Sequence, residues 1–183
     1  MTILHIDSSI NGENSASRAI SKSIVDQLKT GQWGEDVVYR DLAANPLPHL
    51  TFYAFADTSV IDEFFADDTI VIGAPMYNFS LSSQLKAWID RLMVAGKTFR
   101  YTENGPEGLA GGRRVIIALA KGGVYSDGGP AASLEHLETY LRGVFNFMGI
   151  DPEFVVAEGL NISPDHRCRA IEGALGHDLR LAA

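Results

Sequence analysis

Short runs of β-branched and other apolar residues, each closed by polar or turn-forming residues, recur along the chain. Such runs are typical of strands buried on both faces, as in the interior of a parallel sheet. The clearest run, 69–73, meets Ala74-Pro75; because proline has no N–H to donate to a ladder, we expect the strand to stop there. Further runs predict strands at 3–6, 35–41, 113–120 and 153–158.

Between these runs, apolar residues recur at helical spacing. An early helix has Ser15 or Ser17 as its N-cap and ends at Gly31. Other helices are predicted at 60–65, at 134–148 and from Pro164 to Leu175. The clearest amphipathic helix is opened by Ser82, and its apolar face consists of Leu85, Trp88, Ile89, Leu92 and Met93.

Strands and helices alternate through five βα units. This order predicts a single α/β domain over 1–183, with a flavodoxin-like five-stranded parallel sheet and helices on both faces. The loops after strands one, three and four then meet at one edge of the sheet. Residues 98–106 turn at Asn104-Gly105, which indicates a hairpin or an excursion before the fourth strand. Residues 42–57 are predicted to form a loop, and its aromatic side chains either shield a ligand or cover the core.

Composition narrows the functional class. The net charge of −8, without a basic cluster, makes nucleic acid an unexpected partner. The single cysteine, Cys168, excludes an internal disulfide and fits a reducing compartment. No apolar run approaches the ~18 residues that span a bilayer, and Asp7 comes too early for a signal peptide. We therefore expect a cytoplasmic protein with no membrane association.

The loop after the first strand carries three hydroxyl residues, Ser9, Ser15 and Ser17, ahead of a helix N-terminus. Unpaired backbone N–H groups and the helix dipole make such a loop a natural anion site. Hydroxyls here replace the glycines that let a pyrophosphate pass close to the backbone, which favours a mononucleotide over a dinucleotide. The alternative is that all three are caps and turn residues, but capping accounts well for only one of them.

Two more loops lie at the same predicted edge. Residues 76–79 form a dense patch of flat side chains that either stack on a flat ligand or cap the core; spacing alone leaves both open. Gly122-Gly123 either lets the backbone approach a flat ligand or forms a plain turn. Metal-ligand spacing, a G-x-S-x-G elbow and an HExxH motif are all absent from the sequence. Hydroxyl, amide and aromatic groups suit a cofactor that performs the chemistry itself, and one flat ring with one phosphate describes FMN.

Three segments carry a resemblance to a known family. Residues 74–79, the segment 85–90 after them and the stretch 98–109 are similar to the FMN-dependent NADH:quinone oxidoreductase (azoreductase) family. The resemblance extends from the first strand to 157–159. It implies that the phosphate and ribityl chain are held by Ser9, Ser15, Ala16 and Ser17. It further implies that the ring system is held by Pro75, Met76, Tyr77, Asn78, Phe79, Ala120, Lys121, Gly122 and Gly123.

The family reaction implied by this resemblance is a two-electron transfer from NADH or NADPH, through flavin N5, to a quinone or an azo bond. No side chain is an obligate base; the Asn78 backbone and Tyr125 are candidate substrate contacts, and no metal is involved. The resemblance also implies a homodimer with the active site near the subunit interface. One open flavin face for both flat substrates predicts a ping-pong mechanism.

Three alternatives stay open at this stage. They are an NADPH-dependent FMN or flavin reductase of the same fold, a flavodoxin-type electron carrier, and a binding module without flavin. Three departures from the family also leave the physiological acceptor open. The segment 40–68 is shorter than usual, Ala120 stands where serine is common, and Val156 stands where an aromatic residue is common.

Overall fold

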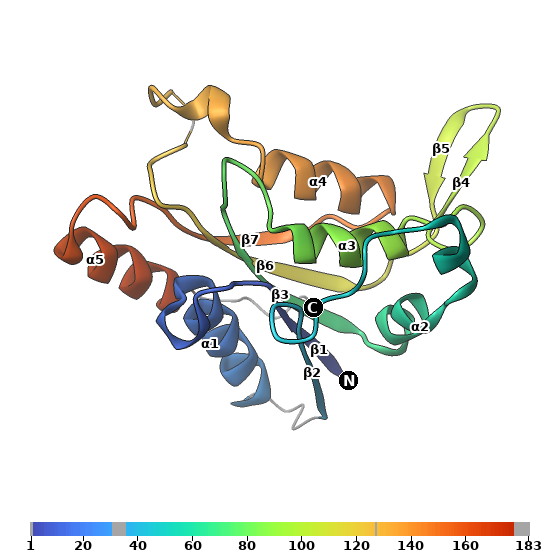
Figure 1. Ribbon diagram of the computed structural model, residues 1–183, viewed down its shortest axis with the longest axis horizontal. Helices are drawn as coiled ribbons and strands as arrows, with labels where there is room; N and C mark the ends of the chain where they lie inside the picture. Colours follow the sequence, from blue (N-terminus) through green and yellow to red (C-terminus); the bar gives the residue numbers. More distant parts are fainter. Residues whose placement is uncertain (1, 31–35, 127, 178–183) are drawn as a thin grey trace.

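A computed structural model describes residues 2–30, 36–126 and 128–177. Its main feature is a parallel sheet of five strands in the order β2-β1-β3-β6-β7 (Figure 1). This is the flavodoxin-like order that the sequence predicts, with the switch point beside the first strand. The strands are β1 (Ile3–Asp7), β2 (Val37–Asp41), β3 (Thr69–Pro75), β6 (Arg114–Ala120) and β7 (Glu153–Ala157). Two predicted boundary residues, Gly31 and Glu35, lie outside the described residues.

Helices cover both faces of the sheet (Figure 1). On one face, α1 (Ala16–Thr30) and α5 (Pro164–Leu175) pack with the strands into one apolar cluster. On the other face, α2 (Ser59–Ala66), α3 (Ser83–Leu92) and α4 (Glu138–Phe147) form a second cluster. Three short 3-10 helices lie in the connections: η1 (Gly12–Asn14), η2 (Phe52–Ala56) and η3 (Ala132–Leu134).

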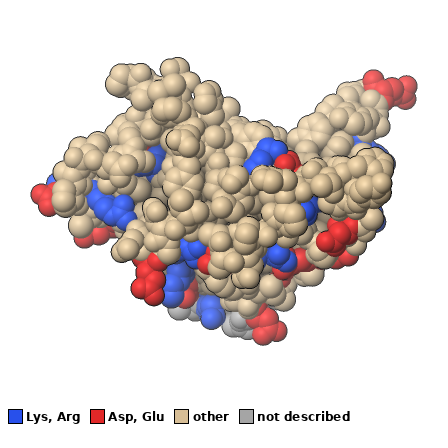
Figure 2. Space-filling view, in the orientation of Figure 1, with Lys and Arg blue, Asp and Glu red and all other residues tan. Residues whose placement is uncertain are grey.

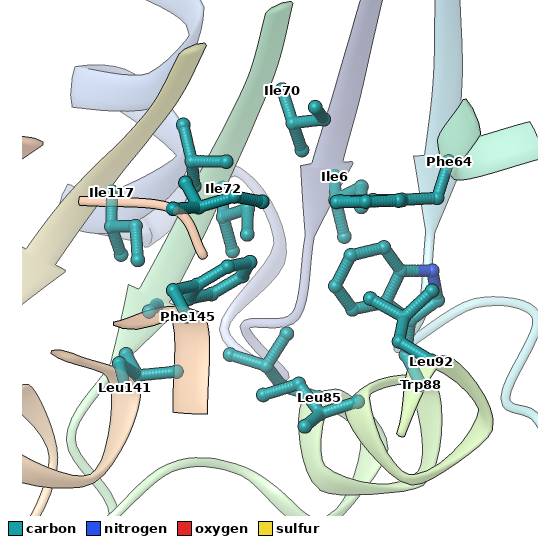
Figure 3. Close-up of a cluster of buried hydrophobic side chains, with 14 of the residues drawn as sticks. Ile6, Phe64, Ile70, Ile72, Leu85, Trp88, Leu92, Ile117, Leu141 and Phe145 are labelled. Carbon is teal, nitrogen blue, oxygen red and sulfur yellow. The ribbon is translucent and has the colours of Figure 1, made fainter. Parts of the chain in front are cut away.

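The central strand β3 is buried along its whole length, as its uninterrupted apolar run predicts. Its side chains alternate between the two clusters: Ile70 and Ile72 face α2, α3 and α4, whereas Val71 faces α1 and α5. Figure 3 shows the first of these clusters, in which Trp88 of α3 packs edge-on against Phe64 of α2. Both aromatic side chains are fully buried, so this contact ties two helices to the sheet and to each other.

Serine caps fix where three of the helices begin. The Ser82 side chain accepts the Leu85 N–H at the start of α3, and Ser163 accepts the His166 N–H at the start of α5. Of the two candidates for α1, Ser15 is the cap, because its Oγ accepts the Arg18 N–H at 3.3 Å.

The start of α4 differs from the prediction. Apolar spacing indicates a helix from Leu134, but the regular helix begins at Glu138, and Leu134 ends η3 instead. The Glu135 carboxylate accepts the N–H groups of Leu137 and Glu138, at 3.2 and 2.9 Å, so it satisfies the first turn from outside the helix. Because Glu135 caps the helix, the regular helix begins after it, and the spacing of apolar residues does not reveal this boundary.

Residues 98–106 form a hairpin, which decides between the two readings of this segment. Strands β4 (Phe99–Thr102) and β5 (Gly105–Gly108) pair antiparallel and project from the body (Figure 1). The loop residues are Glu103 and Asn104, one position earlier than the predicted turn. At its base, Gly108 packs directly on Gly149: a Cβ on Gly108 would lie 2.1 Å from the Gly149 nitrogen.

The surface matches the composition. On the face in Figure 2, Lys and Arg atoms intermingle with Asp and Glu atoms along the lower part, and the described surface of this face shows no continuous basic area. The loop 42–57 leaves its aromatics in solvent rather than on the core, with Phe52 and Tyr53 86% and 87% exposed. Across the described ranges, no helix combines the length and apolar character needed to cross a bilayer.

The close contact at the hairpin base generates a stability prediction. Gly108→Ala places a Cβ against backbone atoms of Met148 and Gly149, which cannot turn aside as a side chain can. We expect a loss of about 2 kcal/mol or more in the free energy of unfolding, measured by urea denaturation. Gly143→Ala in α4 is the matched control: its Cβ meets nothing within 4 Å, so a gain of up to about 1 kcal/mol is expected. Equal stability of Gly108→Ala and the parent would contradict the contact.

Candidate functional site

The loops after β1, β3 and β6 converge on one hollow of about 100 Å³ at the carboxyl ends of these strands. Open α/β sheets bind ligands at this position. The predicted site residues that line it are Ser9, Ser15, Ala16, Pro75, Met76, Ala120 and Gly122. Residues that the sequence argument missed also line it, namely Asn11, Asn14, Leu160, Asn161 and Arg167.

The polar end of the hollow is the hydroxyl loop with the N-terminus of α1. The Ser9 hydroxyl lies 3.1 Å from the Tyr77 hydroxyl, which joins the loop after β1 to the loop after β3. Within the described residues, the backbone N–H groups of Ala16 and Ser17 have no hydrogen-bond acceptor. Two free N–H groups at the positive end of a helix dipole, beside hydroxyls, are the donor set that an anion needs.

Ser17 occupies a different place from the one predicted. Its side chain is fully buried and does not line the hollow; its Oγ lies 3.1 Å from the Ser15 Oγ. Ser15 therefore caps the helix and faces the hollow, whereas the Ser17 hydroxyl supports the Ser15 hydroxyl from behind. Of the three loop serines, Ser9 and Ser15 are the ones that present side chains to a ligand.

Residues 77–80 form a tight turn at the end of β3. Tyr77 and Ser80 exchange both backbone hydrogen bonds, at 2.9 and 3.1 Å. The two tip residues, Asn78 and Phe79, have φ angles of 47° and 71°. This conformation is tolerable for asparagine but strained for a bulky residue such as phenylalanine, and such outliers cluster at ligand sites. Phe79 is held there because its carbonyl accepts the His136 N–H at 3.1 Å.

This turn decides part of the question that spacing left open. Met76 packs partly against the core, as the core-capping reading expects. Phe79 does not: it is 43% exposed, and its ring lies edge-to-face against the Tyr125 ring, 6.3 Å between centroids. A second hollow lies on the other side of this turn. It is lined by Ile10, by Met76, Tyr77 and Asn78, and by residues 80–84. The turn thus borders open space on the side away from the core.

The loop after β6 closes the other side. Gly122 lies against Asn161, and a Cβ on it would come within 2.5 Å of the Asn161 Nδ2. The Lys121 side chain leaves the hollow: it is buried, and its ammonium lies 3.3 Å from both Glu135 and Glu138. Lys121 therefore anchors the start of α4 instead of facing a ligand. Gly123 packs on the Tyr125 ring, so its missing side chain makes room for that tyrosine.

A partly buried ionic network supports the hydroxyl loop from the side of β2. Arg18 makes two bonds to the Asp41 carboxylate, at 2.7 and 2.8 Å, and two to the Ser9 carbonyl, at 2.8 and 3.3 Å. The hydrogen bond from Arg18 holds the pKa of Asp41 below its usual value. This pairing joins β2 to the loop after β1, so the loop is held at both ends.

Three polar groups lie next to that pair: Asp7 and His5, which are buried, and Tyr39, which is half exposed. Asp7 accepts hydrogen bonds from Ser21 and Tyr39, at 2.8 and 3.1 Å. Burial raises the pKa of Tyr39 to about 12, helped by the Asp7 charge. Burial also lowers the pKa of His5, whose Nε2 lies 3.0 Å from the Ser21 Oγ and 3.6 Å from Asp7. The opposing attraction of Asp7 is the smaller effect, so His5 is neutral at neutral pH.

The residues present fit an FMN molecule. The polar end offers hydroxyls, amides and free N–H groups for one phosphate, while Pro75, Met76 and Ala120 offer a smooth wall for a flat ring. None of the residues that line the hollow is an aspartate, glutamate or histidine. Among the described residues, no group of three or more His, Cys, Asp or Glu side chains could hold a metal. The arrangement can bind and orient a cofactor, and it lacks a side-chain base of its own.

The family departures have separate places in the fold. Ala120, where serine is common, is buried in the wall of the hollow. Val156, where an aromatic residue is common, lies on the edge strand β7 with 39% of its side chain exposed. The short segment 40–68 includes two solvent-facing aromatics, Phe52 and Tyr53.

Comparison with known proteins identifies similar chains. A family model described as a flavodoxin-like fold matches residues 1–177. A Bradyrhizobium diazoefficiens protein named FMN-dependent NADH:quinone oxidoreductase 2 is 52% identical, over 96% of this chain and 96% of its own. A Rhizobium meliloti protein named FMN-dependent NADH:quinone oxidoreductase is 54% identical, over 95% and 93%.

Solved structures agree with these relatives. An azoreductase from Bacillus anthracis superposes with a TM-score of 0.86 and 29% identity, over 96% of this chain and 95% of that chain. An FMN-dependent NADH-azoreductase from Bacillus anthracis in complex with FMN superposes with a TM-score of 0.82 and 25% identity, over 96% and 94%. The similarity therefore covers nearly the whole of both chains.

The neutral, buried His5 predicts a pH dependence of stability. Unfolding returns its pKa to about 6.5, so below that pH the unfolded chain binds a proton that the folded chain does not. The free energy of unfolding should therefore fall as the pH drops through about 6.5, and keep falling toward the lowered folded pKa. His5→Gln, which retains a partner for Ser21, should flatten this dependence between pH 7.5 and 5.5 in urea denaturation. A variant as steep as the parent would show that His5 is not the source.

Proposed function

The chain belongs to the family of FMN-dependent NADH:quinone oxidoreductases, which have a flavodoxin-like fold, and we propose that it carries two electrons from NADH to quinones and azo compounds. The observation that carries the proposal is the hollow at the strand ends, with hydroxyls and free N–H groups at one end and the strained turn 77–80 at the other. Relatives named for this reaction share more than half of their residues with the chain.

In this proposal FMN is the tightly bound cofactor and supplies the chemistry, by accepting a hydride from the nicotinamide and reducing the acceptor. Ser9, Ser15, the N–H of Ala16 and the backbone at Ser17 bind its phosphate and ribityl chain. The residues against the ring system are Pro75, Met76, Tyr77, Asn78, Phe79, Ala120, Lys121, Gly122 and Gly123, with Lys121 contributing only its backbone because its side chain is buried beneath α4.

No side chain acts as an acid or base in the proposed reaction. The backbone N–H groups of Asn78 and Phe79 have no acceptor among the described residues, and both residues lie at the exposed tip of the turn. We assign the Asn78 backbone to the reactive edge of the ring, and Tyr125, whose ring meets Phe79, to substrate contact. These two groups orient flat substrates and exclude water from the space between the substrate and the ring.

The proposal includes a cytoplasmic homodimer. Phe52 and Tyr53 leave two large aromatic rings almost fully in solvent, and neither covers the core of its own chain. A second copy of the chain is the occupant that the family resemblance favours for this surface. A cytoplasmic location agrees with NADH as the donor and with the exposed, unpaired Cys168, which suits a reducing compartment.

A direct assay tests the activity. The purified protein should retain FMN and oxidise NADH when menadione is added, and apoprotein should regain this activity with FMN. Ser15→Ala should weaken FMN binding by about tenfold, because it removes a charge-assisted hydrogen bond and a helix cap. Ser23→Ala, on the same helix but away from the hollow, is the matched control and should bind FMN like the parent.

Other outcomes of this assay would contradict the proposal. Bound flavin without NADH oxidation would indicate an electron carrier, and a clear preference for NADPH with free flavin as acceptor would indicate a flavin reductase. A colourless protein that does not retain added FMN would indicate a binding module.

We also propose a ping-pong mechanism. The turn 77–80 and the loop 121–125 flank one ring face, and both nicotinamide and acceptor have to reach the same reactive atom at that face. NAD⁺ therefore leaves before the acceptor enters. Initial rates against NADH at several fixed menadione concentrations should give parallel double-reciprocal lines. At high concentration, menadione should act as a competitive inhibitor with respect to NADH. Intersecting lines would show that both substrates bind together and that the shared-face proposal is wrong.

A further inference from the structure

A guanidinium reaches the hollow from the far end of the chain. Arg167 of α5 lines the same hollow as Ser9, Ser15 and Ala16, and its Nη2 donates to the Asn14 carbonyl at 2.8 Å. In Figure 1, α5 lies beside the start of α1, which is how a residue so late in the sequence meets the hydroxyl loop. The bond to Asn14 fixes the guanidinium next to that loop.

Two cations from neighbouring segments, Arg18 and Lys121, are already paired. Arg18 is engaged by the Asp41 carboxylate and the Ser9 carbonyl, and it does not line the hollow. Lys121 is buried between Glu135 and Glu138. Neither has a charge left over for a ligand.

Arg167 differs from both. Among the residues that the structure describes, no carboxylate forms an ion pair with it, and the hydrogen bond to Asn14 uses one of its five guanidinium N–H donors. No acidic side chain lines the hollow that it faces. A half-buried guanidinium without a counter-ion, fixed at the edge of a polar hollow, is arranged to receive an anion.

We propose that Arg167 is the cationic residue of the phosphate subsite, so that α5 completes a cofactor site otherwise built from neutral groups. The ligand it takes is the dianionic phosphate monoester of FMN, and the inference rests on the proposed function. A phosphate monoester carries about 1.5 to 2 negative charges at pH 7. The guanidinium can donate two parallel hydrogen bonds to this phosphate while it keeps its hydrogen bond to the Asn14 carbonyl.

Arg167 also gives the site a means of distinguishing FMN from riboflavin, which lacks the phosphate. Hydroxyls and N–H groups donate to a neutral oxygen almost as readily as to a charged one, but a guanidinium gains most from the charge. The chain as a whole carries a net charge of −8, which opposes the approach of an anion. A local cation offsets that repulsion at the one point where the phosphate binds.

The test compares Arg167→Gln with Arg169→Gln. Both changes remove one positive charge from α5, but Arg169 is exposed, does not line the hollow and lies about 200° around the helix from Arg167. Dissociation constants of apoprotein for FMN and for riboflavin are measured by quenching of flavin fluorescence. Arg167→Gln should weaken FMN binding at least about tenfold and leave riboflavin binding unchanged. Arg169→Gln should match the parent for both flavins.

Salt concentration separates a charge role from a bracing role, because glutamine can still donate to the Asn14 carbonyl. FMN affinity of the parent should fall as sodium chloride rises from 0.05 to 0.5 M, and that of Arg167→Gln should fall less. Arg167→Lys should recover part of the lost FMN affinity. These results together support the proposal.

Three results would overturn it. FMN binding by Arg167→Gln at the parent's affinity would show that the charge is not used. Equal losses for FMN and riboflavin would show a packing role only, as would identical salt dependence in parent and variant. If the parent itself fails to bind FMN, the proposed function fails with it; if the parent binds FMN and oxidises NADH with menadione while Arg167→Gln is unaffected, only this inference fails.

Discussion

The burial of β3 on both faces is the constraint on which the rest of this fold depends. Every residue of the strand is buried, and it pairs with β1 on one side and β6 on the other. The ladder ends at Pro75, after which the Met76 N–H makes one last bond to the Ala120 carbonyl, 2.8 Å long. Because three parallel strands end together there, the loops that follow them have to share one space, and that space is the hollow.

Electrostatics then decide which parts of this space are rigid. The Arg18–Asp41 pair holds the hydroxyl loop from β2, and Lys121 with its two glutamates holds the start of α4. Both pairs are largely shielded from water, where breaking one partner leaves an uncompensated charge. The ionic groups thus support the loops from behind, while the surfaces toward the ligand are neutral except at Arg167.

Apolar periodicity predicts the five strands and the apolar face of each main helix, and their alternation predicts the strand order, whereas the hairpin at 98–106 stayed one of two alternatives until the structure decided it. Periodicity failed at α4 because a carboxylate, Glu135, caps the helix, and capping by a side chain leaves no trace in spacing. Loop composition located Ser9, Ser15, Met76 and Gly122 on the hollow, since the loops at strand ends converge in any sheet of this order.

The same reasoning could not tell which way a loop side chain turns. Lys121 belongs to the right loop but points beneath α4, and Ser17, in the first turn of α1 next to the right loop, is buried behind Ser15. Arg167 was out of reach for another reason: its proximity to Asn14 depends on how α5 packs beside α1, a tertiary contact between residues 153 positions apart.

The left-handed backbone conformation of Phe79 affects which residues this position can accept during evolution. Glycine would occupy its left-handed backbone position without strain, and asparagine with little, so folding stability alone does not account for a phenylalanine there. A half-exposed ring contributes little burial in return. Under the proposed contact of Phe79 with the ring system, stability and function therefore favour different residues at this position. A population selected only for thermal robustness would drift away from phenylalanine at this turn, whereas under the proposed function one selected for turnover would retain it at a standing cost to the fold.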